Sequence, residues 1–205
     1  MGLELGALVE PTAVAVHAVR QSQLKLGDTA AIFGAGPIGL LLLQAVKAAG
    51  VSEIFVVEVS EERRQKALEL GATHVINPVD TDAVAFIREK TNGGVNVAYD
   101  AAGVQATFTS GVSAVRPGGE FKVVSVWEKP VEFNPNMIVM TEAKISGSYA
   151  YNRLFPEVIR LLASGAIDGQ AVITSKIALD DIVEKGFELL TKDRSQCKIL
   201  VDMNL

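Results

Sequence analysis

The sequence predicts an α/β fold: a doubly wound parallel sheet of six strands in the order 3-2-1-4-5-6, followed by a C-terminal helix-strand tail. Three observations lead to this prediction. Short apolar runs alternate with helix-length segments along most of the chain, a pattern typical of parallel strands joined by right-handed crossovers. A glycine-rich turn follows the first apolar run, and an acidic residue follows the second.

The first half of the chain is expected to alternate strictly between strands and helices after an opening helix, Pro11–Gln21. Ser60 is a suitable N-cap for the second crossover helix, because acidic residues follow it in the first turn. Glycines at 50 and 71 end two of the helices. The expected elements are strand Thr29–Phe33, helix Ile38–Ala49, strand Glu53–Glu58, a helix from Ser60 to Gly71, strand His74–Ile76 and a helix near Thr81–Thr91.

The second half completes the sheet and then changes character. Turn sequences at Asn92–Gly94 and Arg116–Gly119 bound the expected strand Val95–Tyr99 and a helix that runs to Val115. Two more strands, Glu120–Val126 and Lys144–Tyr149, bring the sheet to six. The tail is expected to contain helix Phe155–Ser164, strand Val172–Lys176, helix Leu179–Leu190 and strand Lys198–Asp202.

A short last strand after a completed sheet predicts that this strand pairs with something outside the sheet's own domain. The predicted domains are residues 1–153, which form the dinucleotide-type sheet with its opening helix, and residues 154–205, which form the tail.

The composition limits the partners and the compartment. Hydrophobic residues make up 49% of the chain, enough for a large core, and the formal net charge of −5 argues against nucleic acid or an anionic membrane surface as a partner. The single cysteine, Cys197, excludes an internal disulfide framework and a cysteine-cluster zinc site. The apolar stretch Thr29–Val46 approaches the length of a membrane span, but its central Gly-Ala-Gly-Pro favours a strand-turn-helix. A soluble, cytoplasmic protein is expected.

The glycine-rich turn has the spacing of a dinucleotide-binding fingerprint. Gly34 permits a tight turn, Gly36 lets the backbone approach a pyrophosphate, and Gly39 lets the helix pack closely on the strand. Pro37 suits the first helical turn, where its missing N–H is no loss. The free N–H groups and the dipole of that helix would face the phosphates. This context predicts a Rossmann fold with a bound dinucleotide.

Glu58 follows the second strand, about 20 residues after Gly39, where the fingerprint requires an acidic residue. Its carboxylate would accept hydrogen bonds from the adenosine ribose hydroxyls and would repel a 2′-phosphate, so NAD is expected rather than NADP. Two alternatives share the glycine turn. One is a tight strand-to-helix turn that binds nothing, and the other is a nucleotide site of the methyltransferase type.

Several short segments spread along the whole chain resemble one protein family. They are Ala7–Pro11, His17–Arg20, Gly34–Gly39, Ser60–Arg64, Gly147–Tyr151, Leu161–Gly165 and Asp181–Gly186. Together they resemble the zinc-type medium-chain dehydrogenases of the alcohol dehydrogenase superfamily, most closely 2,3-butanediol and sorbitol dehydrogenases. The resemblance implies oxidation of a secondary alcohol, diol or polyol by hydride transfer to NAD, assisted by zinc.

Members of that family are longer and begin with a separate GroES-like catalytic domain that carries the zinc ligands. Here the similarity begins directly after Gly2. The resemblance therefore implies an isolated coenzyme-binding domain, truncated by engineering or naturally, whose tail would rejoin the missing domain. Such a chain is expected to bind NAD(H) and to be inactive alone.

The resemblance also assigns individual residues, none of them catalytic. Glu10 matches a carboxylate that approaches or coordinates the catalytic zinc, but one carboxylate is no metal site, so zinc is expected only in the full-length enzyme. Ile38 matches a contact beside the pyrophosphate, and Arg63 a contact near the adenosine ribose. The backbone that holds the nicotinamide carboxamide is matched by Ser125, Val126, Tyr149 and Ala150. Asp100, at the end of the fourth strand, is interpreted as a fold-closing carboxylate and is assigned no catalytic role.

Two other functions stay open at this point: a non-catalytic nucleotide-binding module, and a relative of the zinc-independent quinone oxidoreductases. Glu10 and Glu58 weigh against the second. A homodimer or homotetramer is expected through the strand Lys144–Tyr149, because it would be a sheet edge and exposed edges tend to be paired.

Overall fold

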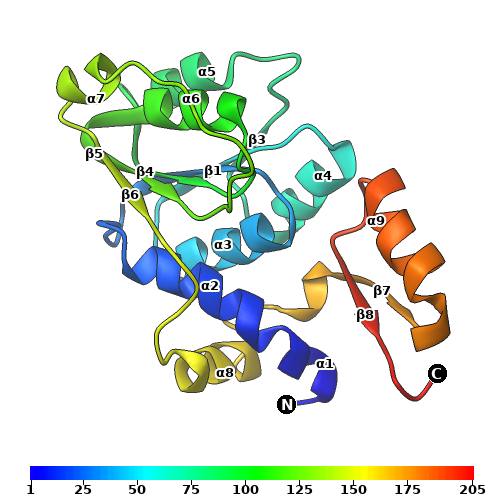
Figure 1. Ribbon diagram of the computed structural model, residues 1–205. Coiled ribbons are helices and arrows are strands. Elements are labelled where there is room, and N and C mark those ends of the chain that lie inside the picture. Colours follow the sequence, from blue (N-terminus) through cyan, green and yellow to red (C-terminus); the bar gives the residue numbers. More distant parts are fainter.

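A six-stranded parallel sheet lies at the centre of the molecule in the computed structural model, which describes residues 1–205 (Figure 1). Its strand order is β3-β2-β1-β4-β5-β6, which confirms the predicted fold class. The order reverses between β1 and β4, the place where doubly wound folds bind ligands. The strands are β1 (Thr29–Phe33), β2 (Glu53–Val57), β3 (His74–Ile76), β4 (Val95–Asp100), β5 (Val115–Val123) and β6 (Lys144–Gly147).

Helices cover both faces of this sheet (Figure 1). One face carries α2 (Val9–Arg20), α3 (Pro37–Ala48) and α4 (Glu61–Leu70), and the other carries α5 (Ala83–Lys90) and α6 (Gln105–Ala114). Two short helices, α1 (Leu3–Ala7) and α7 (Asn136–Val139), were not predicted. None of the helices combines the length and the apolarity that a membrane-spanning helix requires.

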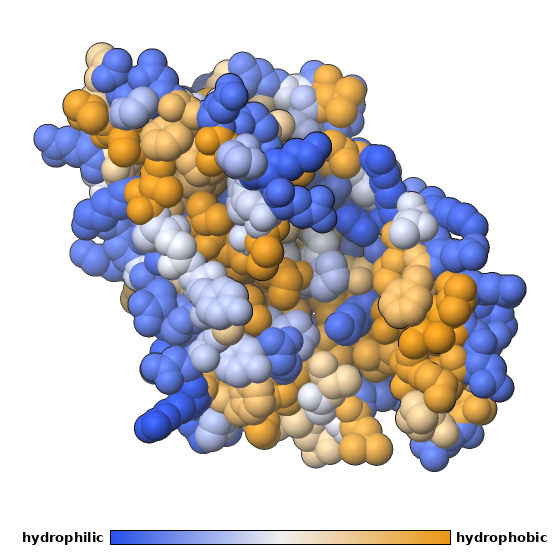
Figure 2. Space-filling view, in the orientation of Figure 1, coloured by the Kyte–Doolittle hydropathy of each residue, from blue (hydrophilic) through white to orange (hydrophobic).

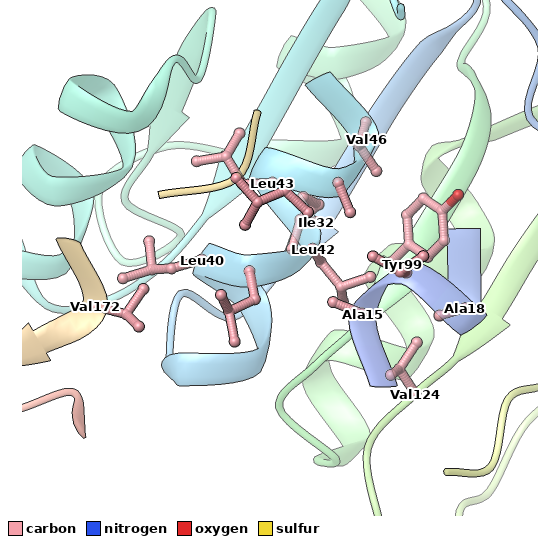
Figure 3. Packing of buried hydrophobic residues seen from close by; sticks show 14 of the residues in the cluster. Ala15, Ala18, Ile32, Leu40, Leu42, Leu43, Val46, Tyr99, Val124 and Val172 are labelled. Atoms are coloured by element: carbon pink, nitrogen blue, oxygen red, sulfur yellow. The ribbon is translucent and has the colours of Figure 1, made fainter. Parts of the chain in front are cut away.

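The larger core lies between the sheet and the layer of α2 and α3. Leu40, Leu42 and Leu43 of α3 pack there with Ile32 of β1 and Ala15 of α2 (Figure 3). These leucines are fully buried, and burial of each contributes about 2 kcal/mol. The apolar run that resembled a membrane span is therefore a buried strand followed by a buried helix.

The register of the strands aligns their carboxyl ends. Phe33 of β1 pairs with Val57 of β2 and with Asp100 of β4. Asp100 in turn pairs with Val123 of β5, and Val123 with Gly147 of β6. These five residues form one row across the sheet, so the loops that follow them share one edge of the molecule.

The tail begins with α8 (Phe155–Ala163), which packs on α2 and adds Val158 and Leu162 to the larger core. A parallel pair of strands follows, β7 (Ile173–Ile177) and β8 (Lys198–Val201). The last strand was expected to pair outside the sheet's domain, and its partner is β7 of the tail itself. A short turn, η1 (Gln170–Val172), precedes β7.

The single helix predicted over Leu179–Leu190 is wrong in detail. The segment is a 3-10 turn η2 (Leu179–Asp181), a π-helix η3 (Ile182–Glu188) and a short α-helix α9 (Leu189–Lys192). Gly186 interrupts its helix propensity and packs so closely on β7 that an added Cβ would lie 3.3 Å from Ile177 Cδ1.

Other boundaries also differ from the prediction, and three of them have a clear structural reason. The first long helix begins at Val9 rather than Pro11, because a proline is tolerated within the first turn. Strand β5 begins at Val115, which pairs with Val95 across an irregularity in the register. It ends at Val123 rather than Val126, because the next two N–H groups both turn to the carbonyl of Asp100.

Candidate dinucleotide site

The three glycines after β1 differ in what surrounds them. Gly34 has a φ of 99°, and a Cβ there would lie 3.1 Å from the Cβ of Ala102 in the turn after β4. A Cβ on Gly39 would lie 2.0 Å from the carbonyl oxygen of Gly34, so only glycine lets α3 pack against the turn. A Cβ on Gly36 would meet no atom within 4 Å. The fold therefore requires glycine at positions 34 and 39, whereas Gly36 borders an open space.

The start of α3 presents unused hydrogen-bond donors to that space. Pro37 is the first helical residue, and no side chain caps the helix. The N–H groups of Ile38 and Gly39 have no acceptor in the chain. Free N–H groups and the positive end of the helix dipole make this an anion-binding position. A phosphate fits both the space at Gly36 and the free donors.

Glu58 directly follows β2 and is tied to the glycine turn. Its side chain is buried, and one carboxylate oxygen accepts the N–H of Ala35 at 2.8 Å. The other oxygen accepts the N–H of Ser60 at 2.9 Å. Ser60 is the N-cap of α4, as predicted, and its hydroxyl accepts the N–H of Arg63. The acidic residue of the fingerprint therefore holds the turn and the following helix at a fixed distance.

Arg63 lies half-buried in the first turn of α4 and reaches the tail. Its Nη2 donates to the carbonyl of Gln196 at 2.9 Å, while its Nε is buried without a partner. The expected contact with the adenosine ribose stays a prediction. What the structure adds is a link between α4 and the loop before β8.

The segments that follow β5 and β6 form the other end of the site, where the sequence predicts contacts through the backbone. Ser125 and Val126 follow β5, and the Val126 side chain is exposed. Tyr149 and Ala150 follow β6; the Tyr149 side chain is 87% exposed, and Ala150 has a φ of 52°, which non-glycine residues seldom adopt. Ser148, next to them, has a buried hydroxyl oxygen without a partner. The exposed Val126 and Tyr149 side chains therefore flank two hydroxyls that face the protein, those of Ser125 and Ser148.

Asp100 is the residue whose partners sequence reasoning did not identify, although its place at a strand end indicated a fold-closing carboxylate. It is fully buried at the end of β4 and accepts hydrogen bonds from the turn after β4 and from Ser125 after β5. The signal for it was its position, since it is a strand-final acid followed by Ala-Ala-Gly on the ligand-facing edge.

A pocket of about 490 Å³ opens between the turn after β4 and the loop after β5. Gly103 and Gln105 line it on one side, and Val126 and Trp127 line it on the other. It lies at the end of the sheet opposite β2 and Glu58, so both halves of the carboxyl edge present binding features.

Glu10 is exposed in the first turn of α2. The loop after α2 contacts Gly118 and Glu120, where the regular pairing of β5 with the amino half of β4 begins, so α2 runs antiparallel to the strands. Its first turn therefore lies towards the carboxyl edge. No three His, Cys, Asp or Glu side chains come close enough together to hold a metal ion. Glu10 has no metal-ligand partners among these residues.

Two other titratable side chains, Cys197 and His74, are packed against the protein interior. Burial raises the pKa of the Cys197 thiol to about 11, so the side chain is protonated at neutral pH. The His74 ring stacks on Phe55 at 4.6 Å between ring centroids. Neither side chain has the surroundings of a nucleophile or a metal ligand.

Comparisons with known proteins agree with this geometry. Over the full chain, the sequence is 48% identical to (R,R)-butanediol dehydrogenase of Bacillus subtilis strain 168 and 34% identical to sorbitol dehydrogenase of the same strain. The crystal structure of 2R,3R-butanediol dehydrogenase from Bacillus subtilis matches with a TM-score of 0.93 over 98% of this chain and 58% of that one. A zinc-binding dehydrogenase from Sinorhizobium meliloti 1021, solved bound to NADP, matches with a TM-score of 0.88 at 30% identity, over 96% and 58% of the two chains.

The chain spans 59% of the butanediol dehydrogenase and 58% of the sorbitol dehydrogenase. Residues 37–164, which include Gly39, Glu58 and the carboxyl ends of β2 to β6, match the zinc-binding dehydrogenase family. This match favours the dehydrogenase interpretation of the glycine turn over a methyltransferase-type site. On its sequence, its sheet and its site geometry, the chain belongs to the family of zinc-binding dehydrogenases.

Proposed function

We propose that this chain is the coenzyme-binding part of an NAD-dependent, zinc-type dehydrogenase that oxidises a secondary alcohol, diol or polyol. The observation that carries the proposal is the glycine turn, with free N–H groups at the start of α3 and Glu58 fixed against it. The names of the butanediol and sorbitol dehydrogenases support the substrate class.

The residues of this edge fit a dinucleotide along its whole length. The N–H groups of Ile38 and Gly39 hold the pyrophosphate in the space at Gly36, and Glu58 faces the adenosine ribose. The backbone after β5 and β6 holds the nicotinamide carboxamide, and the unpartnered hydroxyl of Ser148 supports a polar ligand there. When bound, NAD supplies the carbon that accepts the hydride.

The zinc of the proposed full-length enzyme does not fit these residues alone. Catalytic zinc takes several protein ligands and keeps one open position, and Glu10 is a single carboxylate. We propose that Glu10 faces that metal from the coenzyme side and that the other ligands belong to the part of the enzyme outside these 205 residues.

The preference for NAD over NADP is a separate part of the proposal, because one structural relative was solved with NADP. A 2′-phosphate on the ribose would lie beside the negative charge of Glu58. Calorimetric titration of the chain should give a Kd for NAD at least about tenfold below that for NADP, which corresponds to about 1.4 kcal/mol.

Glu58→Gln removes the charge and should reduce this preference, and Glu58→Ala should abolish it. Glu53→Gln neutralises an acid at the other end of the same strand and should leave the preference unchanged. Equal affinity for the two coenzymes in the unchanged chain would refute the NAD preference, and binding of neither would refute the dinucleotide site.

Two further proposals concern the assembly. We propose that residues 154–205 rejoin the GroES-like catalytic domain, because large apolar side chains of the tail are exposed, among them Val183, Phe187 and Leu190 (Figure 2). We also propose a homodimer or homotetramer through β6, which is an edge of the sheet.

The free, buried cysteine supports the expected cytoplasmic location.

A further inference from the structure

Asp100 is a buried acid that the proposed function does not use. It is the last residue of β4, in the middle of the sheet's carboxyl edge, and its exposed fraction is 0%. A fully buried carboxylate is retained only where hydrogen bonds compensate for the lost water. Its partners therefore show what it does.

The carboxylate joins two loops that follow different strands. Oδ1 accepts the N–H groups of Ala102 and Gly103, each at 3.2 Å, and the hydroxyl of Thr107 at 2.8 Å. Oδ2 accepts the hydroxyl of Ser125. The first three donors belong to the turn after β4 and the start of α6, and the fourth belongs to the loop after β5.

The main chain of the same residue strengthens this junction. The carbonyl of Asp100 accepts the N–H of Val124 at 3.0 Å and that of Ser125 at 3.1 Å. Ser125 is therefore held twice, through its N–H and through its hydroxyl. A charged acceptor makes the hydroxyl contact stronger than a neutral pair would be.

The two loops meet at the wall of the pocket of about 490 Å³. Gly103 has a φ of 71°, and a Cβ there would lie 3.0 Å from the carbonyl oxygen of Val126. The backbones at 103 and 126 are thus in contact, and both residues line the pocket. Releasing either loop from Asp100 would move this wall.

The position of the junction identifies the half of the coenzyme concerned. A doubly wound fold binds one half of a dinucleotide on each side of the point where the strand order reverses. Glu58 marks the adenosine half at the end of β2. The ends of β4, β5 and β6 therefore receive the nicotinamide half.

We propose that Asp100 is a positioning residue for the nicotinamide half of the coenzyme. Its carboxylate holds the loop after β5 against the turn after β4, so that the backbone at Ser125 and Val126 is already in place when the coenzyme binds. Asp100 does not touch the coenzyme, because it is fully buried. This inference rests on the proposed dinucleotide site.

The test compares NAD with ADP-ribose, which keeps the adenosine and the pyrophosphate and lacks the nicotinamide. Asp100→Asn keeps the shape and one acceptor oxygen but loses the charge. Calorimetry should show a Kd for NAD raised about tenfold, the effect of weakening a charge-assisted contact, and a Kd for ADP-ribose within about twofold of the unchanged chain.

Ser125→Ala removes the partner of Oδ2 and serves if Asp100→Asn does not fold. It should give the same selective loss of NAD affinity. The Kd of the double variant for NAD should be no higher than that of the single variant with the higher Kd. Glu120→Gln is the matched control, since Glu120 is a buried, hydrogen-bonded carboxylate on β5 that shares no partner with Asp100. Its Kd values for both ligands should remain unchanged.

The outcomes separate the two proposals. Loss of NAD and ADP-ribose binding to the same extent in Asp100→Asn would overturn the positioning role, because it would show a general structural effect. Unchanged binding of both ligands in both variants would overturn it as well. Failure of the unchanged chain to bind ADP-ribose would instead overturn the proposed dinucleotide site.

Discussion

Gly36 and Gly39 show at the scale of single residues how binding and folding can be separated within one turn. A Cβ at Gly39 would lie 2.0 Å from the carbonyl oxygen of Gly34, and a Cβ at Gly36 would meet nothing within 4 Å. Gly36 also has a φ of −68°, which alanine adopts without strain. The same substitution should therefore act on different properties at the two positions.

Gly39→Ala should lower the free energy of unfolding by about 2 kcal/mol or more, because the added methyl group overpacks the turn. Gly36→Ala should leave the thermal midpoint unchanged and weaken NAD binding, because its methyl group occupies the proposed pyrophosphate position. Thermal unfolding and calorimetric titration of both variants make the comparison. A destabilised Gly36→Ala, or NAD binding unchanged by it, would contradict this assignment.

Sequence reasoning succeeded at residues whose role depends on local spacing. Gly39 and Ser60 act within a few residues of their partners, the carbonyl of Gly34 and the N–H of Arg63, and the structure shows the predicted close packing and N-cap. It did not predict that Arg63 binds the carbonyl of Gln196, which lies far along the chain. Nor did it identify the partners of Asp100, because they come together only when β4 and β5 pair.

At the scale of elements, a buried ion pair joins the loop after α2 to the sheet. Lys122 Nζ lies 2.9 Å from Glu120 Oε1 and donates to the carbonyl of Gln21 at 3.0 Å. Glu120 also accepts the N–H of Gln23 and the hydroxyl of Ser146 on β6. Alternating polar residues in β5 gave no sign of this network, since a polar residue in a strand usually faces water.

Lys122→Met should lower the free energy of unfolding by about 3 kcal/mol, because it leaves Glu120 buried without its counter-charge. The double variant Glu120→Gln, Lys122→Met should recover part of that loss. Urea denaturation measures all three chains. A loss in Lys122→Met no larger than in the double variant would contradict the importance of the pair.

The pair should also make stability depend on pH. Burial acts to raise the pKa of Glu120, but the hydrogen bonds from Ser146 and Gln23 and the charge of Lys122 outweigh it, so the pKa is lowered. An acid with a lowered pKa in the folded state stabilises fully above its unfolded pKa of about 4.3 and loses that contribution as the pH falls. The stability difference between the unchanged chain and Glu120→Gln should therefore shrink below about pH 4.3.

Element boundaries were predictable where a cap or a glycine sets them, and less so elsewhere. The helix from Ser60 ends at Gly71, which has a φ of 105°, as the sequence predicted. The π-helix Ile182–Glu188 was predicted only as part of one continuous helix over Leu179–Leu190. The close packing of Gly186 on β7 is a tertiary contact, and no local pattern reports it.

At the scale of the whole molecule, the free edge of β6 predicts association. The N–H of Ser148 donates to the carbonyl of Val123, so by strand alternation the N–H of Gly147 points away from β5. Light scattering should give about twice the chain mass of 21.8 kDa, or four times for a tetramer. Gly147→Pro removes the outward donor, and its Cβ would meet open space, so this variant should be monomeric. A monomeric unchanged chain at micromolar concentration would contradict the prediction.

The tail provides the last test of how this chain relates to a larger enzyme. Phe187 is 63% exposed, and Val183 and Leu190 are exposed beside it. We predict that the 205-residue chain binds NAD(H) but oxidises neither 2,3-butanediol nor sorbitol, with or without added zinc. Joining it to the part of the Bacillus subtilis butanediol dehydrogenase outside the matched 59% should give zinc-dependent turnover.

The variant Phe187→Asp tests whether the catalytic domain covers the tail in the joined protein. In the isolated chain it should leave the thermal midpoint nearly unchanged, because the side chain already faces water. In the joined protein it should lower both the midpoint and the turnover, because a charge would then be buried in the contact between the tail and the catalytic domain. Val79→Asp, at a similarly exposed valine before α5, is the control and should have little effect in either protein. Zinc-dependent NAD reduction by the purified 205-residue chain would refute the first prediction, and an unaffected joined Phe187→Asp would refute the covered tail.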